Sequence, residues 1–369
     1  MVNNTRVVII GAGPAGIALG ACLKQQGIDF VILERSDQIG NSWRNHYHRL
    51  HLHTAKGFSG LPFMPFPADY PRFPTRQQVI DYLEAYAKHF QLVPQFNQKV
   101  TSVTPQNGRW QTQTADATYT SDFVVVATGL NQVPKSPALP DQEQFKGQIL
   151  HSAGYTTGEL YRNQNVLIVG FGNSGAEIAL DAYEQGANVG ISVRGPVNVV
   201  FLERFGIPVQ LLTILMSPLP PRVVDMLTAP VLMLTIGDLT RYGLQKPSYG
   251  AAEQIQKDAK IPVIDPGVIS KIKQRKIKVY SGIERLTETG VVFTDGTAQP
   301  FDVIVLATGF KTNLNTLLPN YTDDAQALKA STPGLYFCGF KNPATGLLRE
   351  IAIEAQQISK EIAAKIPVH

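Results

Sequence analysis

The chain has 369 residues, 44% of them hydrophobic, and its 33 lysine and arginine residues nearly balance 29 aspartate and glutamate residues. This apolar content is sufficient for a buried core, and the length suggests two domains or one large domain with an insertion. The net charge of +4 is scattered along the chain and does not form the basic stripe of a nucleic-acid-binding protein. We therefore expect a globular protein with no nucleic-acid partner.

The two cysteines, Cys22 and Cys338, lie far apart and form no CxxC motif, which excludes a redox dithiol and a cysteine-built zinc knuckle. Their scarcity fits the reducing cytoplasm. The apolar run that begins at Val7 soon breaks at glycines, so we expect no cleaved leader. The most apolar region, 207–237, is interrupted by prolines and charges and predicts no membrane-spanning helix.

The first pattern along the chain predicts the strand–helix–strand unit of a dinucleotide-binding fold. Its parts are an apolar strand at 7–10, the GxGxxG glycines Gly11, Gly13 and Gly16, a helix to Gln26 and a strand at 30–33. The amides of such a loop and the helix N-terminus bind a pyrophosphate. Glu34 ends the second strand, where a carboxylate accepts hydrogen bonds from ribose hydroxyls and repels a 2′-phosphate. The first site therefore favours FAD or NAD.

The same arrangement returns in the second half of the chain. Its parts are a strand at 166–169, the loop residues Gly170, Gly172, Asn173, Ser174 and Gly175, a helix toward Tyr183 and a strand at 189–193. Arg194 stands where Glu34 stands in the first copy, and its guanidinium can bind a 2′-phosphate through two hydrogen bonds. The second site therefore favours NADP, although Arg194 could also be a solvated charge at a strand end.

Each half also ends in an Ala-Thr-Gly string, at 127–129 and at 307–309. A last strand at 334–339 and a helix at 348–364 then close the first domain, which makes the second domain an insertion. We predict an α/β protein with two Rossmann-like domains, the second inserted into the first. The first domain, whose site favours FAD or NAD, spans 1–149 and 311–369, and the second domain, whose site favours NADP, spans 150–310 with an apolar insert at 201–245.

Between the two units, Phe145, Gly147, His151 and Tyr155 form the string FxGxxxHxxxY. This string resembles the identifying motif of class B flavin-dependent monooxygenases, and Tyr155 resembles the flavin-containing monooxygenase form of it. The chain is most similar to the YUCCA-like indole-3-pyruvate monooxygenase branch and its bacterial relatives. The strings that carry this likeness include 74–76, 169–175, 242–244, 262–265 and 307–310.

The resemblance implies FAD and NADPH as cofactors, with a small molecule and O₂ as reactants. NADPH would reduce the flavin, and O₂ would add at its C4a carbon to give a peroxide that oxidatively decarboxylates an aryl 2-oxo acid such as indole-3-pyruvate. The FAD contacts it implies are Gly11, Gly13, Gly16, Glu34, Arg35, Trp43, Arg44, Gly129 and Gly339. The NADPH contacts it implies are His151, Tyr155, Gly170, Gly172, Asn173, Ser174, Gly175 and Arg194.

Four histidines, at 46, 48, 51 and 53, crowd one segment, but no carboxylate or cysteine completes a ligand set, so we expect no metal site. His53 aligns with an asparagine that reaches the flavin edge in many flavin-containing monooxygenases. His53 is therefore the candidate catalytic residue for stabilising the peroxide. The closing segment departs from the flavoprotein Gly-Asp pattern, because Phe340 follows Gly339.

Several alternatives stay open at this point. The insert can be core, a covering lid or an apolar channel wall, and the arginines available to a substrate carboxylate are Arg49, Arg204, Arg241 and Arg349. The enzyme could instead oxygenate sulfur or nitrogen in small soft nucleophiles, or act as an NADPH oxidase or redox-sensing flavoprotein. The missing CxxC argues against a disulfide reductase. The oligomeric state is open, with a dimer among the options.

Overall fold

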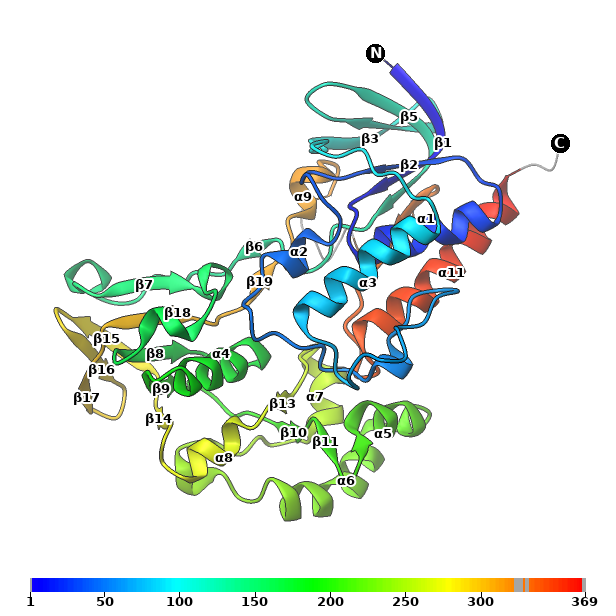
Figure 1. Ribbon diagram of the computed structural model, residues 1–369. Helices are drawn as coiled ribbons and strands as arrows, with labels where there is room; N and C mark the ends of the chain where they lie inside the picture. Colours follow the sequence, from blue (N-terminus) through cyan, green and yellow to red (C-terminus); the bar gives the residue numbers. More distant parts are fainter. Residues whose placement is uncertain (1, 322–327, 329–331, 367–369) are drawn as a thin grey trace. The chain divides into compact units, whose positions relative to one another are not determined.

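A computed structural model describes residues 2–321, 328 and 332–366, and the chain forms two compact units (Figure 1). Unit 1 comprises Met1–Asn45, Thr54–Val133 and Phe310–His369, and unit 2 comprises His46–His53 and Pro134–Gly309. The α/β class and the insertion of one dinucleotide-binding fold into another are confirmed. The sequence placed the boundary at 149/150, whereas residues 134–149 and the short segment 46–53 group with unit 2.

The sheet of unit 1 runs in the order β2-β1-β5-β4-β3, with β20 also paired to β5. The strands are β1 (Val2–Ile10), β2 (Phe30–Leu33), β3 (Ser102–Gln106), β4 (Arg109–Gln113), β5 (Thr118–Val126) and β20 (Leu335–Phe337). Strand β1 is parallel to β2 and β5, and β20 is parallel to β5. The predicted closing strand is thus confirmed, and the carboxyl ends of β1, β5 and β20 meet at one edge.

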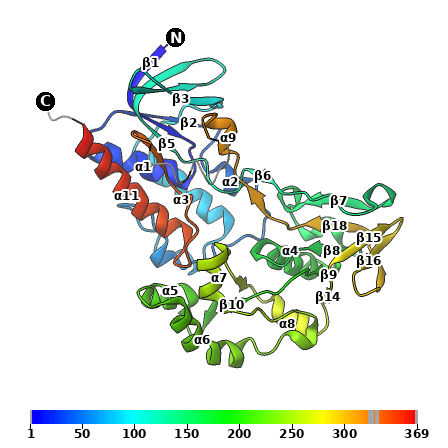
Figure 2. The same cartoon turned by 180° about the vertical axis from the view of Figure 1, so that it is seen from behind.

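Among the helices of unit 1, α1 contacts both α3 and α11 (Figure 2). They are α1 (Pro14–Gln25), α2 (Asn41–Arg44), α3 (Arg76–His89), α9 (Leu314–Leu317), α11 (Leu347–Lys365) and the 3₁₀ turn η1 (Lys56–Phe58). Every residue of α1 from Ala15 to Leu23 is buried and apolar or glycine. Helix α3 begins with a capping box between Thr75 and Gln78. The helix predicted at 348–364 is α11.

The main sheet of unit 2 is parallel, in the order β14-β9-β8-β18-β7. Its strands are β7 (Gln148–His151), β8 (Asn165–Val169), β9 (Asn188–Ser192), β14 (Lys278–Tyr280) and β18 (Val303–Leu306). Helices α4 (Asn173–Glu184) and α8 (Val268–Lys273) pack on each other, and a small antiparallel sheet holds β15 (Ile283–Thr287), β16 (Gly290–Phe293) and β17 (Ala298–Pro300). Because β8 lies between β9 and β18, the strand order reverses at β8, where ligands bind in open α/β sheets.

Short elements complete the chain. They are β6 (Val133–Pro134), β10 (Val199–Phe201), β11 (Glu203–Arg204), β12 (Ile207–Pro208), β13 (Val263–Asp265), β19 (Phe310–Lys311), α5 (Val209–Met216), α6 (Pro221–Thr235), α7 (Ala251–Asp258), η2 (Gln142–Gln144), η3 (Ser152–Gly154), η4 (Gly158–Tyr161) and η5 (Thr240–Tyr242). No residue of α6 is buried, so this part of the apolar insert is not core. Within the described residues, no helix is long and apolar enough to cross a membrane.

Candidate functional site

The glycine loop of unit 1 combines two glycines that the fold requires with one that leaves room for a ligand. Gly11 has a φ of +108°, and a Cβ on it would lie 2.8 Å from the carbonyl oxygen of Ala127. A Cβ on Gly16 would lie 1.8 Å from the carbonyl oxygen of Gly11, whereas one on Gly13 would meet no atom within 4 Å. Helix α1 begins beside this open space with no side-chain cap. The loop therefore fits a pyrophosphate at the helix N-terminus.

Glu34 closes the loop from the end of β2. One carboxylate oxygen accepts a hydrogen bond from the Ala12 amide at 2.7 Å, and the other accepts from the amide and hydroxyl of Ser36 at 2.9 and 2.8 Å. The residue is only 7% exposed. Because two carboxylate oxygens offer about four acceptor sites, Glu34 can hold the glycine loop and still accept a ribose hydroxyl. The sequence indicated only the second of these roles.

The other FAD contacts expected in unit 1 lie in different surroundings. Arg35 is exposed, and Trp43 is half-buried on α2. Arg44 follows Trp43 on α2, donates to the carbonyl of Ile39 at 3.0 Å and pairs with the Glu84 carboxylate. Arg44 is therefore engaged within unit 1, and the contacts of these three residues with flavin stay predictions.

Gly129 and Gly339 follow β5 and β20, so both lie near the sheet edge at which Gly11 follows β1. Both have positive φ, +77° and +81°, and a Cβ on Gly129 would meet nothing within 4 Å. The amide of Gly339 donates to the buried carboxylate of Glu354 on α11 at 2.8 Å. This anchor was missed in the sequence, where the departure at Phe340 was the only signal.

The glycine loop of unit 2 repeats the geometry of the first. Gly170 has a φ of +102°, and a Cβ on it would lie 2.7 Å from the carbonyl oxygen of Ala307. A Cβ on Gly175 would lie 2.2 Å from the oxygen of Gly170, and one on Gly172 would again meet nothing within 4 Å. Helix α4 has no side-chain cap. A second pyrophosphate therefore fits here for the same physical reasons.

The polar residues of this second loop bind protein groups. The side-chain oxygen of Asn173 accepts from the amide of Ile264 at 2.8 Å, and Ser174 hydrogen-bonds to the Tyr47 hydroxyl. Their side chains thus fix the start of α4. Arg194, just beyond β9, is exposed and pairs with no carboxylate in the part of the chain that the structure describes. Such a guanidinium remains available to a phosphate, and its contact with NADPH stays a prediction.

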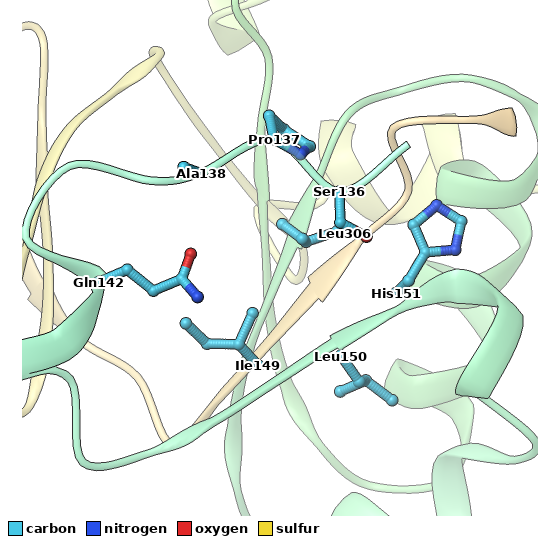
Figure 3. Close-up of a pocket in the computed structure, with 8 residues that line it drawn as sticks. All are labelled: Ser136, Pro137, Ala138, Gln142, Ile149, Leu150, His151 and Leu306. Atoms are coloured by element: carbon cyan, nitrogen blue, oxygen red, sulfur yellow. The ribbon is translucent and has the colours of Figure 1, made fainter. Parts of the chain in front are cut away.

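His151 lies at the end of β7, where its two ring nitrogens have separate partners. Its Nε2 donates to the carbonyl of Gly309 at 3.0 Å, and its Nδ1 accepts from the amide of Ala153 at 3.1 Å. This arrangement requires a neutral ring, and burial lowers the pKa of His151 although the hydrogen bond to Gly309 opposes the shift. Figure 3 shows His151 at one end of a cavity of about 360 Å³, with Gln142 at the other.

Tyr155, the other marker of the motif, is 1% exposed and packs in the core of unit 2. Its hydroxyl donates to Asp181 of α4 at 2.8 Å, and the same carboxylate oxygen accepts from the amide of Gly158. Burial and the nearby Asp181 raise the pKa of Tyr155, so it stays protonated. In this structure Tyr155 packs the segment after β7 onto α4, and a direct contact with NADPH stays a prediction.

His53, the candidate catalytic residue, lies beside α4, in a cluster with Arg49, Glu177 and Glu184. Its Nε2 donates to Glu177 at 2.9 Å, Arg49 donates to the other oxygen of Glu177 at 2.6 Å, and the Nε of Arg49 donates to Glu184 at 3.1 Å. Burial raises the pKa of Glu177, but His53 and Arg49 outweigh it and hold that pKa below its usual range. Removing one partner of such a buried pair typically destabilises a protein by about 3–5 kcal/mol.

Glu177 was not singled out from the sequence. A carboxylate in an otherwise apolar stretch of a buried helix was the available signal, because a buried charge needs partners. In this cluster only the Glu177 carboxylate lies at hydrogen-bonding distance from an imidazole, that of His53. Among the described residues, no group of His, Cys, Asp and Glu could hold a metal ion. The role of His53 beside flavin stays a prediction.

The chain is similar to known proteins over most of its length. The family model described as "FMO-like: Flavin-binding monooxygenase-like" matches residues 4–325. The probable indole-3-pyruvate monooxygenase YUCCA1 of Arabidopsis thaliana is 39% identical over 375 residues, which cover 96% of this chain and 89% of that protein. The indole-3-pyruvate monooxygenase YUCCA6 of the same plant is 42% identical over 324 residues, covering 85% and 78%.

Solved structures share the fold at lower identity. A flavin-containing monooxygenase from Stenotrophomonas maltophilia superposes with a TM-score of 0.71 at 23% identity, covering 98% of this chain and 99% of the other. Cyclohexanone monooxygenase from Rhodococcus sp. Phi1 bound to NADP⁺ superposes with a TM-score of 0.75 at 19% identity, covering 99% and 85%. At these identities the likeness shows the fold alone.

Proposed function

The chain belongs to the flavin-binding monooxygenase-like family and is an NADPH-dependent flavin monooxygenase with FAD and NADPH as cofactors, and we propose that it oxidatively decarboxylates an aryl 2-oxo acid such as indole-3-pyruvate. The likeness to the two YUCCA relatives over most of the chain supports this substrate class. In the structure, the pair of glycine loops supports the use of two dinucleotide cofactors, since the loops have the same geometry but opposite charges beyond their second strands.

These opposite charges assign one cofactor to each unit. Glu34 disfavours a 2′-phosphate in unit 1, and Arg194 favours one in unit 2, so we assign FAD to Gly11, Gly13, Gly16 and Glu34, and NADPH to the loop around Gly172. When bound, the flavin would accept two electrons from NADPH and activate O₂. The chain's own residues bind the two pyrophosphates at helix N-termini, and burial together with the bond that Nδ1 accepts from the Ala153 amide keeps His151 neutral.

The carboxylate of a 2-oxo acid needs a cation, and the structure narrows the four candidate arginines. Arg49 is paired with Glu177 and Glu184, Arg204 is exposed with its guanidinium over the ring of Phe205, and Arg241 is exposed beside Asp238. These three are therefore poor candidates for binding a buried substrate carboxylate.

Arg349 differs from the other three. It lies half-buried in the first turn of α11, in the unit to which we assign FAD, and it pairs with no carboxylate among the residues the structure describes. The positive end of α11 adds to its attraction for an anion. We therefore assign the substrate carboxylate to Arg349.

The test is product analysis with the purified holoenzyme, indole-3-pyruvate, NADPH and ¹⁸O₂. The substrate's bond between C1 and C2 breaks, C1 leaves as CO₂, and one oxygen atom of O₂ enters the new carboxyl group at C2. The other oxygen leaves as water with two electrons from NADPH and protons from NADPH and solvent. We expect indole-3-acetate with one ¹⁸O and CO₂ in equal amount.

Other outcomes would change the conclusion. Turnover of a thioether or an amine without turnover of any 2-oxo acid would replace the substrate class by sulfur or nitrogen oxygenation. NADPH consumption that yields only hydrogen peroxide, whatever the substrate offered, would identify an oxidase or a sensor instead.

A further inference from the structure

Residues 46–53, here called the strap, lie between two segments of unit 1 in the sequence but belong to unit 2. The chain passes from α2 of unit 1 into the strap after Asn45 and returns to unit 1 at Thr54. Helix α2 carries Trp43 and Arg44, two of the expected FAD contacts. The strap therefore directly follows the expected FAD contacts in the sequence, but its own contacts are with unit 2.

The first half of the strap is held by packing and by neutral hydrogen bonds. Tyr47 is 2% exposed and lies in the core of unit 2, and its hydroxyl bonds to Ser174. The amide of His48 donates to the carbonyl of Thr156 at 2.8 Å. These contacts do not depend on any charge in the strap.

The second half is held by charge. Arg49 and His53 each donate to a different oxygen of Glu177, whose side chain is 3% exposed. Glu184 takes a further bond from Arg49 but is 45% exposed, so water can replace it. The backbone between the two donors turns, with the Nδ1 of His51 donating to the carbonyl of Arg49 at 2.6 Å. Glu177 is thus the buried anchor that both strap donors, Arg49 and His53, share.

The anchor lies on the helix that begins at the second glycine loop. Ser174, Glu177, Asp181 and Glu184 recur at helical spacing on α4, and three of them bind the strap. Glu177 lies one helical turn beyond Ser174, which belongs to the loop that we assign to NADPH. One rigid helix therefore carries both the cofactor loop and the attachment point of the strap.

We propose that Glu177 is a positioning residue for hydride transfer from NADPH to flavin. By fixing Arg49 and His53 on α4, it joins the chain that carries the expected FAD contacts to the helix that carries the expected NADPH loop. Its carboxylate bonds to Arg49 and His53, so it acts through these two residues. This inference rests on the proposed assignment of FAD to unit 1 and NADPH to unit 2.

The first experiment is anaerobic stopped-flow reduction of the flavin by NADPH in Glu177→Gln. Glutamine keeps the shape of glutamate and can still bond one strap residue, but it lacks the charge that holds both. We expect the reduction rate at saturating NADPH to fall at least 10-fold, while the Kd for NADPH changes less than 3-fold because the glycine loop and Arg194 are untouched.

A second readout needs no turnover. Hydrogen–deuterium exchange of the FAD-loaded protein without NADPH should be at least 10-fold faster at residues 49–53 in Glu177→Gln than in wild type. Exchange at residues 46–48 should stay as in wild type, because Tyr47 remains packed. This contrast within one segment separates release of the charged half from general loosening of the fold.

Two further variants serve as controls. Glu184→Gln removes a carboxylate from the same arginine on the same helix, and we expect less than a 3-fold change in both readouts because this carboxylate is half-exposed. Arg49→Met combined with Glu177→Gln removes both charges and leaves no unpaired buried arginine. If Glu177→Gln alone does not fold, this double variant replaces it, with the same expected slow reduction.

The outcomes are distinct. Wild-type reduction rates in both Glu177 variants would overturn the proposal, and so would fast exchange at 49–53 with an unchanged reduction rate, which would make Glu177 purely structural. A wild-type protein whose flavin NADPH does not reduce would overturn the proposed function itself, and this result appears before any variant is made.

Discussion

The two glycine loops share their backbone geometry, but the helices that follow them are held in different ways. Helix α1 of unit 1 is buried among apolar residues and packs on α3 and α11. Helix α4 of unit 2 buries the carboxylates of Glu177 and Asp181, which bind the strap and Tyr155. Apolar packing accepts any surface of matching shape, whereas buried carboxylates require partners with donors at defined places. Helix α4 therefore requires a segment with matching donors, which the strap provides through Arg49 and His53.

The largest expected effect comes from the glycines that the fold itself requires. In Gly16→Ala and Gly175→Ala the new Cβ would overlap a carbonyl oxygen of the same loop, so the loop must shift. We expect Gly16→Ala to purify without FAD and Gly175→Ala to keep FAD but lose saturable reduction by NADPH. Flavin absorbance after gel filtration and NADPH titration measure these losses.

The matched controls are Gly13→Ala and Gly172→Ala, whose Cβ atoms enter open space. They should keep the thermal stability of wild type without added cofactor and lose cofactor affinity only. A stability loss in these variants equal to that of the first pair would show that the open space belongs to the fold and not to a ligand.

The next effect tests whether Arg194, which stands where Glu34 stands in unit 1, binds the 2′-phosphate of NADPH. Arg194→Ala removes a charge-assisted contact worth about 2–3 kcal/mol, which corresponds to a roughly 30- to 150-fold rise in KM for NADPH. The KM for NADH should not change, because NADH lacks the 2′-phosphate. Steady-state kinetics with both nucleotides measure the ratio, and equal changes for the two would remove Arg194 from the site.

A smaller effect tests helix α11, which carries Arg349 in its first turn. Arg349→Met removes the cation assigned to the substrate carboxylate and keeps most of the side-chain volume. We expect KM for indole-3-pyruvate to rise about 10-fold, as for loss of one charge-assisted hydrogen bond, with KM for NADPH unchanged. Arg204→Met is the control on an exposed arginine, and a larger effect there would move the assignment.

The smallest effect concerns the polar anchoring of α4. The pKa of Glu177 lies below its ordinary value of 4.5 in the folded protein, so the unfolded chain takes up a proton first as the pH falls. The stabilisation is therefore complete above about pH 4.5 and declines as the pH drops through the folded value. Urea unfolding should show the gap in stability between wild type and Glu177→Gln narrowing below that pH. A constant gap would contradict the shifted pKa.

Much of the fold followed from local pattern. Apolar runs bounded by glycines predicted the strands at 7–10 and 30–33 and at 166–169 and 189–193, and each lies within or overlaps a strand of the structure. Helical spacing predicted α11 to within one residue at each end. Strand–glycine–helix patterns are local, since each residue's neighbours in sequence determine its conformation and burial.

The candidate site was predictable only where it depends on such local patterns. The glycine loops are an example, because a positive φ and a close backbone approach require glycine whatever the distant surroundings. The cluster of Arg49, His53 and Glu177 joins residues 128 and 124 positions apart in the sequence, and the bond from Gly339 to Glu354 depends on how α11 returns to the sheet. No local pattern states which distant carboxylate a cation will meet.

The sequence by itself determined the two dinucleotide-binding folds, their order, the insertion of one into the other and the opposite charges at Glu34 and Arg194. The tertiary structure alone decided that the strap belongs to unit 2, that Arg49 pairs with carboxylates whereas Arg349 pairs with none among the described residues, and that Tyr155 is buried. The physical reason is that backbone conformation depends mainly on neighbouring residues, whereas the pairing of buried charges depends on which distant groups the completed fold brings within hydrogen-bonding distance.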